Sequence, residues 1–116
     1  MKTLPLFLAA AACQSASTPA EPAAACSVTV RFGSYAMGID AATAAAVDKL
    51  LAGSGDVTDV SRSAAGREGE YALCVATRDA AGAARIFNAV AALLPPKPRG
   101  PIEVEGAGRH VRAPAR

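Results

Sequence analysis

The segment from Phe32 to Asp40 is the part of this chain whose residue types best suit binding chemistry. It reads Phe-Gly-Ser-Tyr-Ala-Met-Gly-Ile-Asp and combines two glycines, the hydroxyl of Ser34, the ring of Tyr35 and a carboxylate before a predicted helix. Backbone N–H groups at a helix N-terminus can hold an anion, so Ser34, Tyr35 and Asp40 form a possible ligand loop. The segment matches neither common phosphate-loop motif and contains no Lys or Arg. We therefore favour a structural interpretation, in which Asp40 caps the helix while Tyr35 and Met37 pack the end of the domain.

The only histidine, His110, lies among basic residues near the C-terminus, far in sequence from Ser34. A catalytic histidine needs a nucleophile and an orienting partner within hydrogen-bond reach. No histidine lies near Cys26 or Cys74 in the sequence, and the chain has no Cys-x-x-Cys motif that would indicate a metal site. The sequence therefore predicts no catalytic residue, no metal and no cofactor.

Residues 1–12 have the composition of a cleaved export signal. Lys2 supplies one positive charge, and an apolar stretch of about ten residues follows and ends in four alanines. A helix that spans a membrane needs roughly 20 apolar residues, so this stretch is too short to be an anchor helix. We expect the segment to direct export and then to be removed.

The end of this segment, Ala10-Ala11-Ala12-Cys13, resembles the lipobox of bacterial lipoprotein precursors. The resemblance covers residues 1 to about 14 and implies that Cys13 receives a diacylglycerol and becomes the first residue after cleavage. Position 10 differs from the pattern, because the family usually has Leu there. Gln14, in place of Asp, favours the outer membrane by the same resemblance. The alternative is an ordinary signal cleaved nearby, which would leave a soluble periplasmic protein.

If Cys13 carries lipid, as the resemblance implies, Cys26 and Cys74 remain as a possible disulfide pair in an oxidising compartment. The alternation of the predicted strands raises a difficulty. Cys26 has the parity of Val28, which faces the core, whereas Cys74 has the parity opposite to that of its neighbours. A bulge, or a position of Cys26 before the strand begins, would remove the conflict. Two separate thiols are the alternative.

Residues 13–25 contain small residues and prolines and no bulky apolar residue, which predicts a disordered tether after the lipidated cysteine. The chain carries a formal charge of +2, which is too close to zero to indicate nucleic-acid binding. Positive charge gathers in residues 97–116, and residues 106–116 are predicted as a basic tail. The tail is expected to be solvated.

Residues 26–105 are predicted to fold as one small domain. Alternation of apolar residues predicts strands at 27–32 and 70–77, a weaker strand is predicted at 57–63, and a short strand follows at 102–105. Asp40 and Asp79 are the predicted N-caps of two helices, ended by Gly53 and by Pro95 respectively. Residues 109–112 either pair back on the last strand through a glycine turn or trail off.

The order β-α-β-β-α-β is the ferredoxin-like pattern of an α+β fold, an antiparallel sheet with two helices on one face. Many unrelated functions use that architecture, so it gives little functional information. We predict a lipoprotein anchored in the cell envelope and facing the periplasm, whose domain is not an enzyme and either binds an envelope protein or simply occupies the periplasmic surface. The alternative is a small-ligand or anion-binding module that uses the 33–40 loop.

Overall fold

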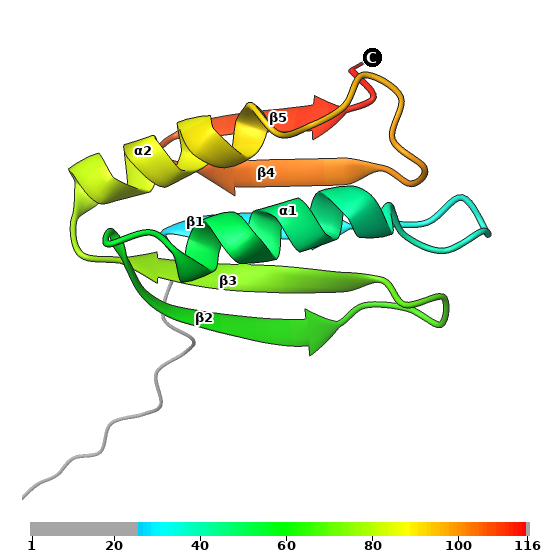
Figure 1. Cartoon of the computed structure of the whole chain (residues 1–116), viewed down its shortest axis with the longest axis horizontal. Helices are drawn as coiled ribbons and strands as arrows, with labels where there is room; N and C mark the ends of the chain where they lie inside the picture. Colours follow the sequence, from blue (N-terminus) through cyan, green and yellow to red (C-terminus); the bar gives the residue numbers. More distant parts are fainter. Residues whose placement is uncertain (1–25, 116) are drawn as a thin grey trace, which may run out of the picture.

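The computed structural model describes residues 26–115 of the chain (Figure 1). The predicted signal, the predicted lipidation of Cys13 and the predicted tether therefore lie outside the described residues. The described part is an α+β domain that consists of one five-stranded antiparallel sheet and two helices.

The chain alternates strands and helices in the predicted order and then adds one more strand. The elements are β1 (Val28–Phe32), α1 (Ala41–Ala52), β2 (Val57–Ala64), β3 (Tyr71–Thr77), α2 (Ala80–Ala91), β4 (Ile102–Gly106) and β5 (Arg109–Ala113). Their order across the sheet is β2-β3-β1-β4-β5, and each neighbouring pair is antiparallel. Both helices cover the same face of this sheet, and the other face is open (Figure 1).

The core lies between the helices and the sheet. Alternate residues of β1, β3 and β4 point toward the helices, as the period of two in a strand requires. The fully buried side chains are Val28, Val30, Phe32, Val47, Leu73, Val75, Val90, Ile102 and Val104. Phe32 contacts Tyr71 at a ring-centroid distance of 5.1 Å. Aromatic pairs at this separation stabilise a small core beyond the area that they bury.

Residues 109–113, part of the stretch expected as a basic tail, form β5 and pair with β4 over their whole length. Of the two alternatives for residues 109–112, pairing back on the last strand is therefore confirmed. Ala107 and Gly108 have φ values of 53° and 73°, the left-handed conformation that a two-residue hairpin turn requires. On the helix side, Arg109 donates a hydrogen bond to the Asn88 side chain and stacks over the Phe87 ring. These contacts attach the hairpin to α2.

Helix α2 begins at the predicted cap, where Asp79 accepts a hydrogen bond from the backbone N–H of Gly82, but it ends earlier than the prolines predict. Leu93 and Leu94 follow the helix instead of forming its last turn. Their N–H groups donate to the carbonyls of residues three positions earlier, a tighter turn than the α-helix. Pro95 disfavours the helical conformation in Leu94, the residue before it, so the helix does not continue to the prolines. Both leucines still pack against the core.

Candidate functional site

The predicted disulfide between Cys26 and Cys74 is present, with Cα atoms 5.1 Å apart. Cys26 lies before the first residue of β1, so the alternation of that strand does not fix its direction. Cys74 is paired with Thr29, and its neighbours Leu73 and Val75 are buried under the helices. The bond therefore lies on the open face of the sheet. It joins the start of the described chain to β3.

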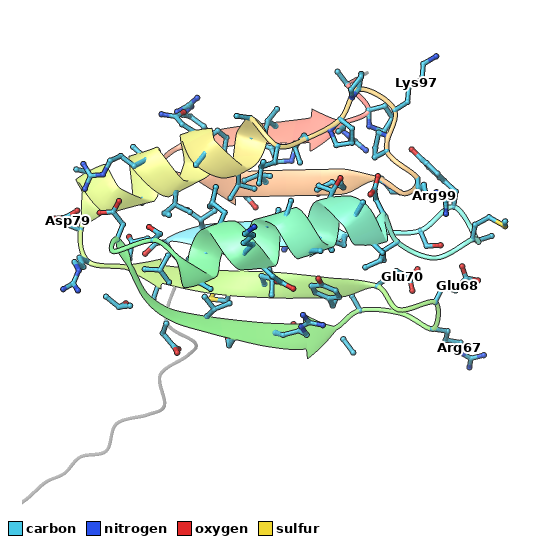
Figure 2. The ribbon with its side chains drawn as sticks, viewed as in Figure 1. Arg67, Glu68, Glu70, Asp79, Lys97 and Arg99 are labelled. Carbon is cyan, nitrogen blue, oxygen red and sulfur yellow. A yellow bond between two sulfur atoms is a disulfide. The ribbon has the colours of Figure 1, made fainter. Side chains whose placement is uncertain are left out.

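The hydroxyl of Ser34 forms three hydrogen bonds within the protein. It accepts from the N–H groups of Ala36 and Gly38, at 2.8 and 2.9 Å, and donates to Glu68 Oε1 at 2.8 Å. Glu68 belongs to the turn between β2 and β3, at the same end of the molecule as Arg99 (Figure 2). The hydroxyl thus ties two loops together, and a ligand would have to displace these bonds.

Both carboxylate oxygens of Asp40 are also used, and the residue is buried. Oδ1 accepts from the backbone N–H of Thr43 at 3.0 Å, which caps α1 as predicted, and Oδ2 accepts from the backbone N–H of Arg99 at 3.0 Å. Burial acts to raise the pKa of this carboxyl, but the hydrogen bonds from Thr43 and Arg99 outweigh it, and the pKa is lowered. The N-terminus of α1 therefore already holds a negative charge, which would repel an anionic ligand.

The expected packing role of Tyr35 and Met37 is wrong. The two residues are 56% and 85% exposed, although the Ser34 hydroxyl fixes this loop by accepting hydrogen bonds from the N–H groups of Ala36 and Gly38. The reason is the turn itself: Ala36 and Gly38 have φ values of 88° and 91°, and the chain turns on the Ser34 hydroxyl instead of folding its apolar side chains inward. The structure thus brings Ser34 and Asp40 to one end of the domain, but it leaves Tyr35 pointing into solvent.

The open face of the sheet is lined by polar side chains, most of them charged and in pairs. Arg31 lies 3.6 Å from Glu105, and Glu103 lies 3.8 Å from Arg112 and 3.9 Å from His110. All of these groups are partly exposed, and exposed ion pairs contribute little to stability. Their effect is to keep the face polar. A face of this kind lacks the apolar centre of a stable protein interface.

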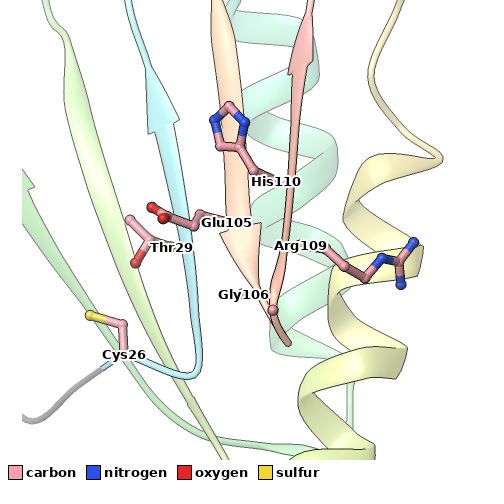
Figure 3. Close-up of a pocket in the computed structure, with 7 residues that line it drawn as sticks. Cys26, Thr29, Glu105, Gly106, Arg109 and His110 are labelled. Atoms are coloured by element: carbon pink, nitrogen blue, oxygen red, sulfur yellow. The ribbon is translucent and has the colours of Figure 1, made fainter.

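A shallow depression of about 510 Å³ lies on this face beside the disulfide (Figure 3). Thr29, Glu105 and His110 cross it as one row, because Glu105 is paired with Thr29 on one side and with His110 on the other. Neighbouring strands are about 4.8 Å apart, so the backbones at Thr29 and His110 are separated by roughly 10 Å, with the strand of Glu105 between them. A nucleophile and its base must be in hydrogen-bond contact. This row does not have that arrangement.

Within residues 26–115, no group of three or more His, Cys, Asp or Glu side chains is placed to hold a metal ion. Neither α1 nor α2, the helices of this part of the chain, is long and apolar enough to cross a bilayer.

Sequence reasoning did not predict the surface ion pairs or the exposure of one strand. Arg85 of α2 donates two hydrogen bonds to the carboxylate of Asp56, at 2.9 and 2.7 Å, and these bonds lower the pKa of Asp56. No spacing rule relates residues so far apart in sequence. Strand β2 was predicted, but its exposure from Thr58 to Ala64 was not. The absence of bulky apolar residues on alternate positions was the signal for that exposure.

Comparison with known proteins gave no relative for this chain: no protein family, no curated protein and no solved structure matches it. The function must therefore be argued from the residues and their geometry.

Proposed function

We propose that this chain is an exported bacterial lipoprotein, anchored to a membrane through Cys13, whose domain binds another envelope protein and catalyses no reaction. The observation that carries the proposal is the disulfide between Cys26 and Cys74. Disulfides persist in oxidising compartments such as the bacterial periplasm and are rare in the cytosol. The pair therefore supports export on grounds independent of the N-terminal signal.

The cysteine count supports the anchor. The chain has three cysteines, and with two of them paired, Cys13 is the remaining thiol. It directly follows the lipobox-like alanines, where a thiol is needed for attachment of diacylglycerol. One acyl chain holds a protein only marginally to a membrane, whereas two or three chains hold it stably. Gln14 supports the outer membrane, with the domain on the periplasmic side.

We further propose that the domain has the ferredoxin-like arrangement, extended by one strand. Two observations support this: β1 lies between β3 and β4, and the β-α-β-β-α-β order precedes β5. Strand β5 then adds to the outer edge of β4. Because this architecture hosts many unrelated functions, the proposed binding role does not depend on it.

The alternative function, a small-ligand or anion-binding module in the 33–40 loop, has weaker support. Its hydroxyl and its carboxylate hydrogen-bond within the protein. Asp40 also gives the start of α1 a negative charge, as described above. A domain that binds another protein requires no such loop, and the exposed strand β2 offers a surface for a partner.

Membrane fractionation tests the anchor. The native chain and Cys13→Ser are expressed in a bacterium that processes lipoproteins, and the membranes are washed with high salt to remove proteins held only by charge. We expect the native chain to stay in the membrane fraction and Cys13→Ser to be lost from it, while the neighbouring substitution Gln14→Ser keeps the protein with the membranes. Equal membrane retention of native chain and Cys13→Ser would contradict the anchor.

A further inference from the structure

Strand β2 forms one edge of the sheet and is exposed on both faces. It pairs only with β3, and it is eight residues long, whereas β5 at the opposite edge has five and is followed directly by Pro114 (Figure 1). Every residue from Thr58 to Ala64 is exposed, including Val60 at 39%. A long edge strand with an exposed apolar residue is a template for pairing with another chain.

The register shows which main-chain groups of β2 are free. The N–H of Ala65 donates to the carbonyl of Glu70, and in an antiparallel ladder the groups that face the partner strand alternate along the chain. Counting back in steps of two, Ser63, Ser61 and Asp59 face β3. The N–H and C=O groups of Val60, Arg62 and Ala64 therefore point outward, to the edge of the sheet.

A groove of about 350 Å³ runs between the C-terminal part of α1 and the start of β2. Leu51, Val57 and Val60 give it an apolar lining, and Asp48 adds a carboxylate; Asp59 borders the groove. Arg62 lies 3.7 Å from Asp48 and stacks over the Tyr71 ring at 3.9 Å, so it balances the charge of Asp48. The side chain of Asp59 lies on the opposite, open side of β2, and among the described residues it has no ion-pair partner within 4.0 Å.

We propose that β2 binds an extended segment of a partner protein as an added strand, and that this segment alternates apolar and basic side chains. Val60 shares the helix side with its partner Val75, and Asp59 shares the open side with Ala76. An added strand would place alternate side chains on these two sides, with an apolar residue beside Val60 and a basic residue beside Asp59. The inference rests on the proposed interaction role and identifies the surface and the class of partner.

Charge favours a different protein over a second copy of this chain. Two copies paired through β2 would bring two Asp59 carboxylates onto the open side of the joined sheet, while each Asp48 would stay balanced by Arg62 on the helix side. Like charges placed close together in an interface oppose association. A basic segment would instead neutralise Asp59.

Amide hydrogen exchange measured by NMR tests the proposal. The protein is the oxidised full chain with Cys13→Ser, and the probe is the blocked peptide Thr-Lys-Val-Lys-Val-Lys-Thr. At a peptide concentration ten times the Kd, the outward N–H groups of Val60, Arg62 and Ala64 should exchange about tenfold more slowly, because they exchange only from the free state. Ser61 and Ser63, already bonded to β3, should change little. Protection that alternates along β2 is specific to strand addition.

Matched variants separate the binding edge from the fold. Val60→Pro removes an outward N–H without breaking the β2–β3 ladder and should abolish the protection. His110→Pro is the control on β5, the opposite edge, and should leave peptide binding unchanged. The Gly33 N–H donates to the carbonyl of Pro101, and the alternation from this bond across β4 to β5 directs the His110 N–H outward as well. Asp59→Asn keeps the main chain intact and should weaken binding of the lysine peptide several-fold.

Three results would overturn the proposal. One is the absence of alternating protection at about 1 mM peptide, since a Kd of 1 mM corresponds to a binding free energy of only about −4 kcal/mol. A second is equal binding of the peptide with glutamate in place of lysine. The third is protection of Val60, Arg62 and Ala64 by concentrated protein alone, which would identify a second copy as the occupant. None of these results depends on acylation of Cys13, so failure here and failure of the membrane anchor are distinguishable.

Discussion

At the scale of single residues, Asp40 shows how a side chain that suits ligand chemistry is used for structure. Its position before α1 was predicted from the sequence, because Asp is a preferred N-cap. Its second hydrogen bond, from the backbone N–H of Arg99, joins residues 59 positions apart and follows from no local pattern. The same holds for the bond between Ser34 and Glu68. Local rules therefore found the residues, and only the fold could show what they contact.

Replacing Asp40 by Asn should destabilise the domain at neutral pH and have a smaller effect in acid. Asn can still cap α1, but it lacks the charge that strengthens the bonds from Thr43 and Arg99. We expect a loss of about 1 kcal/mol in the free energy of unfolding at pH 7. The folded pKa of Asp40 is lowered, so the contribution of the ionised carboxylate is complete above the unfolded pKa and is lost as the pH falls through the folded pKa.

Urea unfolding of the native chain and Asp40→Asn, at pH 7 and at about pH 3, measures this effect. The difference in unfolding free energy between the two proteins should shrink at the lower pH. A difference that is the same at both pH values would show that the carboxylate charge has no part in stability. Asp40→Ala, which also removes the cap, should be less stable than Asp40→Asn at both pH values.

At the scale of elements, the sequence pattern predicted the first four strands and both helices. It succeeded because β1, β3 and α2 each bury one continuous face. It left β5 undecided, since residues 109–113 are mostly exposed and their place depends on the turn at Ala107 and Gly108. The binding edge on β2 was not predicted, because an exposed edge strand carries no apolar alternation.

The disulfide is the interaction between elements with the largest expected effect. It closes a loop with a sequence separation of 48 residues. On the chain-entropy model, a loop of that size stabilises the folded state by roughly 4 kcal/mol. Cys26→Ser combined with Cys74→Ser should lower the midpoint of urea unfolding strongly, and reductant should lower the midpoint of the native chain similarly. Cys13→Ser is the control and should leave the midpoint unchanged. Equal midpoints for oxidised and reduced native chain would contradict a structural role for the bond.

At the scale of the whole molecule, the disulfide and the exposed loop lie at the two ends of β1. Cys26, the first described residue, precedes the start of β1. The loop that contains Tyr35 and Met37 follows the end of β1. The charge-paired open face favours solvent, which leaves β2 as the surface best suited to a partner.

The mass of the intact protein, extracted from membranes and alkylated with and without prior reduction, tests the account most directly. We predict a chain that begins at Cys13, carries added acyl chains and gains two alkyl groups only after reduction. That result would establish the anchor and the Cys26–Cys74 pair together. An unprocessed chain that begins at Met1 and takes up three alkyl groups without reduction would contradict export, and the proposed lipoprotein function would be wrong.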